Sequence, residues 1–385
     1  MSANWGRAKC HQQIFRCVTR SEPECWFLDP YPVDSHRFFR DQWLHRSRYK
    51  WSVAELPPRA WRWRLRFGGA VLAEQIVAGG GRPDIVVCTS MCDASQVRAR
   101  LNCPVVVYWH ENQLTYRRDS PDLLGCALRH ASTLLATRWH LINSRTHRAQ
   151  FAAALERHMR GWDTDSRIAV VPERVRAAHV IPPPVPVPDT PGHVGDREPL
   201  LLWNHRWCPE KRPEWLLDVV RVLHRQPELS WRLAVVGSQN EATPAVFDAI
   251  RACAGPRLVA FGHQPRERYH ALVREAAIVL STSAEENFGI SVAETIAHGA
   301  LPVLPDLPVY REFWNGVAHF FDTPQAAGRI LSRLLQTRAW ADAAGREARR
   351  RCVAESCSAD QQATSLDEIV AAALDAKGAT VQILF

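Results

Sequence analysis

The sequence has no long apolar segment. In its 385 residues, no uninterrupted apolar run comes close to the roughly eighteen residues of a membrane-spanning helix. Its first residues, MSANWGRAKCHQQIFRC, also lack the apolar core of a secretory signal peptide. The sequence therefore excludes a transmembrane protein, gives secretion no support and predicts a cytoplasmic location.

Cysteine pairs at metal-binding spacing are also absent. The chain has 11 cysteines, an odd number, and none of them form a C-x-x-C pair. This pattern argues against a secreted disulfide framework and against a zinc ribbon. The D-x-D triplet Asp163-Thr164-Asp165 stands in a polar segment and is interpreted as a turn. We therefore expect reduced, mostly buried thiols and no metal site.

Lysine is scarce, because only four of the 48 basic residues are lysines. With 40 acidic residues the formal net charge is +8, which is a mild indication of a polyanionic partner. GC-rich coding produces the same bias toward arginine. Net charge alone therefore does not separate a nucleic-acid-binding protein from an ordinary enzyme.

What the sequence does contain is an alternation of short apolar runs and helix-length amphipathic segments. Hydrophobic residues make up 46% of the chain and charged residues 23%, as in folded globular proteins. Runs such as PDIVVCTS (83–90) and AIVLSTS (277–283) are typical of parallel strands buried on both faces. Prolines crowd residues 182–191, and the alternation restarts after them. The pattern predicts an α/β protein of two Rossmann-like domains facing across a ligand-binding cleft.

Two motifs in the second half carry candidate chemistry. NHRWCPEKRP places Arg206 and Lys211 at the turn between a predicted strand and a helix, where two cations and a helix amino end can bind a diphosphate. A solvated basic turn is the alternative for this segment taken alone. EENFGISVAE places Glu286 after a predicted strand and Glu294 inside the next helix, where carboxylates can accept hydrogen bonds from sugar hydroxyls. Gly289 lets the backbone approach a ligand closely.

The ordered pair R-x4-K and E-x-F-G-x4-E resembles the retaining GT-B glycosyltransferases of family 4, which use nucleotide-sugar donors. The resemblance implies that Arg206 and Lys211 bind the donor diphosphate, that Glu286 contacts the transferred sugar and that Glu294 binds the nucleotide ribose. It implies a donor site completed by Asn287, Phe288 and Gly289. GT-B enzymes can use protein cations in place of a metal, so no cofactor and no metal are expected.

The first half is similar to the tRNA-queuosine mannosyltransferases. The similarity rests on LDPYPVDSHRFF (28–39), ELPPRAWRWRLRFGGAVLAEQ (55–75), TSMCDAS (89–95), INS (142–144) and above all YWHENQLTY (108–116). These enzymes transfer mannose from GDP-mannose to the cyclopentenediol of queuosine in the anticodon of tRNA(Asp). The resemblance thus implies GDP-mannose as donor and queuosine-modified tRNA as partner. One loop departs from the family, because Val33-Asp34 replaces a Gly-Gly pair before Ser35 and His36.

The first twenty-five residues lack periodicity, the crowded prolines mark a boundary between two domains, and the GT-B resemblance adds the return of the last helix. We expect an N-terminal arm at 1–25, a Rossmann-like acceptor domain at 26–188, a Rossmann-like donor domain at 197–358, and a C-terminal helix at 359–385 that returns to the first domain.

Acceptor contacts are expected from the first domain. His110, at the end of a predicted strand, is a candidate to bind the transferred sugar and is counted with Arg206, Lys211 and Glu286 as catalytic. Glu111, Asn112, Ser35 and His36 are candidates for the acceptor side. No general base is assigned, because in a retaining transfer the leaving diphosphate can deprotonate the attacking hydroxyl. Stabilisation of that diphosphate by Arg206 and Lys211 is then the main catalytic effect.

PRAWRWRLR (58–66) interleaves arginines with indoles, a combination suited to phosphates and unpaired bases. In a helix, Arg59, Arg62 and Arg66 would share one face. An amphipathic helix start with its tryptophans packed inside is the alternative. The family resemblance favours RNA, so the expected acceptor contacts also include the following residues: Arg59, Trp61, Arg62, Trp63 and Arg64.

Two other functions stay open on the sequence. One is a family 4 glycosyltransferase with a lipid, glycan or small-molecule acceptor, which would not need tRNA. The other is a tRNA-binding protein without transfer activity, suggested by the altered Val33-Asp34 loop.

Overall fold

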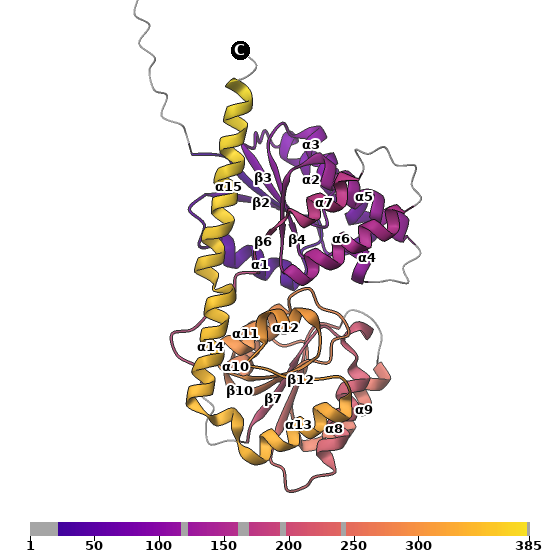
Figure 1. Ribbon diagram of the computed structural model, residues 1–385, viewed down its shortest axis with the longest axis vertical. Helices are drawn as coiled ribbons and strands as arrows, with labels where there is room; N and C mark the ends of the chain where they lie inside the picture. Colours follow the sequence, from indigo (N-terminus) through magenta and orange to yellow (C-terminus); the bar gives the residue numbers. More distant parts are fainter. Residues whose placement is uncertain (1–21, 117–121, 161–168, 193–197, 240–243, 383–385) are drawn as a thin grey trace, which may run out of the picture.

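A computed structural model describes residues 22–116, 122–160, 169–192, 198–239 and 244–382. Most of the predicted arm and the triplet Asp163-Thr164-Asp165 lie outside the described residues, as does part of the proline-rich boundary. In the described part of the chain, two six-stranded parallel sheets, one in each half, lie at opposite ends of an elongated molecule (Figure 1). The predicted α/β GT-B fold class is thus confirmed.

The first domain has the strand order β2-β1-β3-β4-β5-β6. Its strands are β1 (Cys25–Asp29), β2 (Trp51–Glu55), β3 (Ile85–Thr89), β4 (Val105–Trp109), β5 (Trp139–Ile142) and β6 (His179–Val180). Its helices are α1 (Asp34–Leu44), α2 (Trp61–Ala78), α3 (Ala94–Arg100), α4 (Gln113–Tyr116), α5 (Leu123–Ala136), α6 (Arg145–Met159) and α7 (Val170–Arg176). The central strands β3 and β4 are buried along their whole length, as their unbroken apolar runs predict.

The second domain has the strand order β12-β11-β10-β7-β8-β9. Its strands are β7 (Leu200–Asn204), β8 (Arg232–Val236), β9 (Leu258–Gly262), β10 (Ala276–Leu280), β11 (Leu301–Pro305) and β12 (His319–Phe321). Its helices are α8 (Pro213–His224), α9 (Pro244–Ala254), α10 (Arg266–Glu275), α11 (Ile290–Ala297), α12 (Pro308–Trp314), α13 (Pro324–Thr337) and α14 (Ala343–Cys357), with short 3₁₀ turns at Pro209–Lys211, Gly255–Arg257 and Ala339–Ala341. The helix α15 (Ala359–Gln382) follows.

Two strands were not anticipated from the sequence. Every residue of the edge strand β2 is at least partly exposed, so its sequence, WSVAE, carries no continuous apolar run. The strand β12 is only three residues long. At the amino end, β1 begins with the buried Cys25, a residue that the predicted arm had included.

The chain crosses between the domains twice, at Val185 and at Ser358, and the two crossings pair as a parallel bridge. The amide of Val185 donates to the carbonyl of Cys357, and the amide of Ala359 donates to the carbonyl of Val185, each at 2.9 Å. Beyond this bridge, α15 packs on α1, β3 and β4 of the first domain (Figure 1). The carboxyl ends of both sheets meet at the cleft between the domains.

Asp367 anchors α15 on the first domain. Its buried carboxylate accepts hydrogen bonds from the Trp43 indole (2.9 Å), the Ser47 hydroxyl (2.8 Å) and the Arg48 amide (2.7 Å). These three donors lie at and after the carboxyl end of α1. A single carboxylate therefore ties the last helix to the element that also borders the cleft.

Two observations bear on compartment and chemistry. Among the described residues, no helix is both long and apolar enough to cross a membrane. The nine cysteines in the described ranges are all free thiols, and most of them are buried.

We expect Asp367→Ala to lower the free energy of unfolding by about 3 kcal/mol, because it leaves three donors without their carboxylate. Urea unfolding followed by circular dichroism measures this loss. The matched control is Asp360→Ala on the same helix, whose 92% exposed side chain pairs with Arg46, and its effect should stay within about 0.5 kcal/mol. Equal effects of the two substitutions would contradict the anchoring role.

Candidate active site

A cavity of about 560 Å³ lies between the two domains. The first domain lines it from the start of α1 and the end of β4, and the second domain from the ends of β7, β8, β9 and β10 and from α10 and α11. Its polar lining residues include Asp34, Ser35, Arg37, His110, Glu111, Asn204, His205, Arg206, Lys211, Ser238, His263, Gln264, Arg266, Tyr269, Glu286, Asn287, Ser291 and Glu294. Both sheets thus contribute their carboxyl ends to one site, as expected for this class of fold.

Lys211 and Glu286 form an ion pair at the wall of this cavity. The ammonium of Lys211 donates to Oε1 of Glu286, and their side chains are only 6% and 12% exposed. Ser283 also donates to this carboxylate, at 3.2 Å. The Thr282 hydroxyl donates to the Lys211 carbonyl at 2.6 Å and fixes the 3₁₀ turn that carries the lysine. The pair therefore joins two loops of the second domain and forms a charged, preorganised corner of the cavity.

Arg206 brings the second cation to the same corner. Its side chain is 40% exposed and lies 3.9 Å from the carboxylate of Glu210. Each cation thus has a carboxylate neighbour, and Arg206 is the more accessible of the two. An anion such as a diphosphate is suited to this corner.

Gly289 shapes the loop that follows Glu286. Its φ of +89° lies in the left-handed region, and α11 begins directly after it. A Cβ atom here would lie 3.1 Å from the ring of Tyr310. Glycine is thus required both by the backbone angle and by the close packing, which lets α11 present its amino end to the cavity.

Glu294 lies one turn into α11 and has a perturbed acidity. Burial raises its pKa to about 7, while a hydrogen bond from the Tyr269 hydroxyl (3.0 Å) and the charge of Arg266 act in the opposite direction. The Asn204 side-chain amide donates to the Tyr269 oxygen at 3.3 Å. The carboxylate is therefore held by a chain of side chains from β7, α10 and α11, and it changes charge near neutral pH.

His110 ends β4 and is almost fully buried in the cavity wall. Its ring stacks on His36 with centroids 4.2 Å apart and packs edge-on against Phe39. Burial, with the nearby His36 and His147, keeps the pKa of His110 well below its usual value. The imidazole is thus neutral at physiological pH and can act as a hydrogen-bond partner without charge.

Hydrogen bonds across the cleft join this wall to the Glu286 loop. The Asn143 side chain donates to the His110 carbonyl at 2.8 Å, and the Asn287 side chain donates to the same carbonyl at 3.4 Å. The Ser144 hydroxyl donates to the Asn287 carbonyl at 2.7 Å. The ends of β4 and β5 therefore hold the donor-domain loop in register with His110.

Three lining residues carry buried polar atoms with no hydrogen-bond partner among the described residues. These atoms are Nε2 of His110, Oδ1 of Asn204 and Nε2 of His205. Buried polar atoms are nearly always satisfied in folded proteins. Their gathering around one cavity favours a ligand rich in hydrogen-bonding groups.

The structure brings most of the predicted site residues together. Those that line the cavity are Arg206, Lys211, Glu286, Asn287, Phe288, Gly289, Glu294, His110, Glu111 and Ser35. His36 and Asn112, predicted as acceptor contacts, are buried behind the wall instead. The Asn112 amide is already used, because its oxygen caps Leu114 and Thr115 at 3.0 Å and its nitrogen donates to Thr115 and His147 at 2.9 Å. The structure therefore places neither residue at the cavity surface, and their contact with the acceptor stays a prediction.

The segment from Arg59 to Arg64 does not line the cavity. The helix α2 begins only at Trp61, after Ala60 in a left-handed conformation, so Arg59 lies outside the helix face that the sequence predicted. Arg64 is buried and therefore poorly placed for phosphates, and Trp61 packs against the hydrophobic core. Arg59, Arg62 and the 43% exposed Trp63 stay at the surface. The predicted contact surface is thus reduced to these three of its five residues.

Sequence reasoning missed several lining residues. Gly237 and Ser238 follow β8, His263 and Gln264 follow β9, and Tyr269 lies on α10. The first four were detectable in principle, since each pair directly follows a parallel strand. Tyr269 carried no local signal, because only the fold brings α10 against α11.

No cluster of three or more His, Cys, Asp or Glu side chains able to hold a metal ion is found within the described ranges.

Comparisons with known proteins agree with this geometry. Residues 24–185 match the model of the N-terminal domain of tRNA-queuosine alpha-mannosyltransferases, and residues 192–351 match that of glycosyl transferases group 1. The tRNA-queuosine alpha-mannosyltransferase of Drosophila melanogaster is 25% identical over 320 residues, which cover 76% of this chain and 82% of the relative. The GDP-mannose:cellobiosyl-diphosphopolyprenol alpha-mannosyltransferase of Xanthomonas campestris is 29% identical over 53% of this chain and 55% of its own length.

Solved structures share the fold. Sucrose-phosphate synthase from Thermosynechococcus elongatus superposes with a TM-score of 0.69 at 14% identity, over 92% of this chain and all of that one. TarM superposes with a TM-score of 0.59 at 14% identity over 78% of this chain, which spans only 58% of the length of TarM. At these identities the likeness concerns the two-domain architecture alone.

We expect Tyr269→Phe to raise the pKa of Glu294 above about 7, because the lost hydrogen bond stabilises the ionised carboxylate. Carbon-13 NMR of glutamate-labelled protein measures this titration, with Glu294→Gln to assign the signal. Tyr49→Phe, remote from the cavity, is the matched control. An unchanged or lowered Glu294 pKa in Tyr269→Phe would contradict the described hydrogen bond.

Proposed function

The chain belongs to the tRNA-queuosine alpha-mannosyltransferase family of GT-B glycosyltransferases, and from this premise we propose that it transfers mannose from GDP-mannose to the cyclopentenediol of queuosine in the anticodon of tRNA(Asp). One observation carries the proposal. The donor motif residues Arg206, Lys211, Glu286 and Glu294 line the same cavity as His110, which comes from the block that most resembles the family.

The donor half of the cavity suits a nucleoside diphosphate sugar. Arg206 and Lys211 supply positive charge for the two phosphates, and the Glu294 carboxylate can accept hydrogen bonds from the ribose diol. Glu286, held by Lys211, can accept from hydroxyls of the transferred sugar. The donor therefore lies with its nucleotide toward α10 and α11 and its sugar toward the first domain.

The chemistry proceeds with retention at the anomeric carbon. The bond from this carbon to the diphosphate oxygen breaks, a bond to an acceptor hydroxyl oxygen forms on the same face, and the hydroxyl proton passes to the departing diphosphate. Arg206 and Lys211 stabilise the negative charge that develops on GDP, which is the main contribution of the protein. The neutral imidazole of His110 orients a sugar hydroxyl from the opposite wall.

A macromolecular acceptor is supported by the surface of the first domain near the amino end of α2. There, Arg59 and Arg62 are exposed beside Trp63, whose indole is available to stack on an unpaired base. Arg66 and the 45% exposed Phe67 continue this surface along the helix. We assign the anticodon arm of tRNA to this surface.

Mass spectrometry of nucleosides tests the function directly. Queuosine-containing tRNA incubated with the protein and GDP-mannose should gain one hexose on queuosine, and UDP-galactose or UDP-glucose should give little or none. Arg206→Ala and Glu286→Gln should reduce the yield about a hundredfold or more, because each removes a group that meets the developing charge or the sugar. Arg221→Ala, an exposed arginine on α8 paired with Asp218, is the matched control and should keep full activity.

Contrary results separate the alternatives. A hexose transferred from GDP-mannose to a lipid, glycan or small molecule, with none on tRNA, would replace queuosine as the acceptor. Tight binding of tRNA without turnover of any donor would identify a binding protein.

The acidity of Glu294 predicts how donor affinity depends on pH. The ionised carboxylate accepts hydrogen bonds from the ribose better than the protonated acid, so GDP affinity should fall as pH drops below about 7. Calorimetric titration with GDP between pH 5.5 and 8 measures this effect. Glu294→Gln should bind more weakly and lose this acid-side dependence relative to the wild type. The same acid-side loss in both proteins would show that Glu294 does not contact the ribose.

A further inference from the structure

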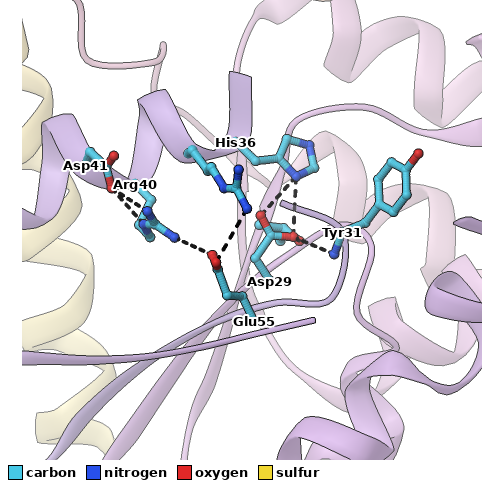
Figure 2. Close-up of polar contacts among 8 residues, drawn as sticks. Asp29, Tyr31, His36, Arg40, Asp41 and Glu55 are labelled. Atoms are coloured by element: carbon cyan, nitrogen blue, oxygen red, sulfur yellow. Dashed lines mark hydrogen bonds and ion pairs between the residues drawn. The ribbon is translucent and has the colours of Figure 1, made fainter. Parts of the chain in front are cut away.

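A buried carboxylate and imidazole lie directly behind the cavity wall. Asp29 is the last residue of β1, and His36 lies on the first turn of α1. Nδ1 of His36 lies 3.2 Å from one carboxylate oxygen of Asp29 and 3.4 Å from the other (Figure 2). The side chains are 1% and 2% exposed, which separates them from the surface ion pairs that Arg40 makes nearby.

Asp29 has further hydrogen-bond partners besides His36. Its carboxylate also accepts from the Tyr31 amide at 3.0 Å and from the Thr89 hydroxyl at 3.1 Å. Burial alone would lower the pKa of His36, but the charge of Asp29 and the hydrogen bond to it raise this pKa above its usual value. Glu111 adds to the rise, and the positive charge of Arg206 opposes it. The short contact with Asp29 thus favours the protonated form of His36.

Fold stability is a weak explanation for this pair. Two buried charges recover little net stability, because their desolvation offsets their attraction. Nε2 of His36 is buried and has no hydrogen-bond partner among the described residues, which adds a further cost. The pair also lies at the end of β1, next to β3, where the strand order of the sheet reverses, the position at which ligands bind in open α/β sheets. Its position thus points to the cleft.

The imidazole of His36 contacts His110, and His110 lines the cavity. The two rings stack at 4.2 Å with an angle of 19° between their planes. Phe39 and Tyr108 also pack against the His110 ring. His36 is therefore one of three rings that pack against His110 and fix its orientation.

We propose that Asp29 and His36 form a positioning pair that holds an imidazolium against His110 and places a fixed positive charge behind the wall that faces the donor diphosphate. The inference rests on the proposed function for its ligand, a nucleoside diphosphate. His36 is a positioning residue, because it acts through His110 and through its charge without reaching the cavity surface.

The charge of Arg206 links this pair to the ligand. The groups that face His36 are Asp29, Glu111 and Arg206, together with His110, which itself faces His147. Arg206 alone among the charged members of this set opposes the imidazolium. A diphosphate bound at Arg206 removes that opposition, so binding raises the affinity of His36 for its proton. By reciprocity, the imidazolium raises the affinity for the diphosphate by the same factor.

Proton NMR of the wild-type protein tests whether GDP raises the affinity of His36 for its proton. A variant is needed only to assign the signal. We expect the His36 ε1 signal, assigned by its loss in His36→Gln, to titrate above the usual histidine range and to shift further upward when GDP is added. Titration below that range, or no shift on addition of GDP, would overturn the inference.

Calorimetry with GDP tests the reciprocal effect of the imidazolium on the affinity for GDP. Between pH 6.5 and 9 the affinity of the wild type should fall by about fivefold or more as His36 loses its proton. Asp29→Asn and His36→Gln should abolish this alkaline-side loss. GDP itself titrates equally with every protein, so comparing wild type and variant at the same pH cancels its contribution. The change in affinity caused by Glu294 is the loss at acid pH described above.

The matched controls leave the pair intact. Asp360→Asn changes an exposed partner of Arg46, and His45→Gln changes an exposed histidine just after α1, so both should keep the wild-type pH profile. A wild-type profile in Asp29→Asn would overturn the inference even if transfer to queuosine is found. Absence of GDP binding by the folded wild type would instead contradict the proposed donor, while the titration of His36 without ligand still reports on the pair.

Discussion

The hydrogen bonds across the cleft hold the two halves of the active site in one arrangement. Ser144 and Asn287 join the ends of β4 and β5 to the loop that carries Glu286, while Asn143 ties the two strand ends to each other, so the two sheets meet at fixed carboxyl ends. The return of α15 to the first domain limits how far the domains can part. Donor and acceptor groups that lie far apart in the sequence therefore face one cavity.

Within that cavity, two carboxylates have different surroundings. Glu286 pairs with Lys211, whereas Glu294 lies mainly among neutral side chains and burial raises its pKa to about 7. On the opposite wall, the Asp29 carboxylate raises the pKa of His36 despite its burial, whereas burial lowers the pKa of His110. The same residue types thus differ in acidity because their neighbours differ, as the proposed combination of sugar recognition and stabilisation of a leaving diphosphate requires.

The sequence predicted much of this because parallel buried strands leave a strong local signal. Arg206, Glu286 and His110 each follow such a strand, so topology alone brought them to the cleft. The exposed edge strand β2 and the short β12 left no such signal. His36, Asn112 and Arg64 were predicted as ligand contacts because residue type does not reveal burial. Tyr269 was missed because its role depends on packing between α10 and α11.

We propose that a GDP-linked sugar lies across this cleft, with its diphosphate at Arg206 and Lys211 and its ribose at Glu294. A crystal structure with GDP bound measures this directly. We expect phosphate oxygens within hydrogen-bonding distance of both cations, ribose hydroxyls hydrogen-bonded to Glu294, and the guanine near Ser238 and Gln264. GDP bound elsewhere, or bound here with its ribose away from Glu294, would contradict it.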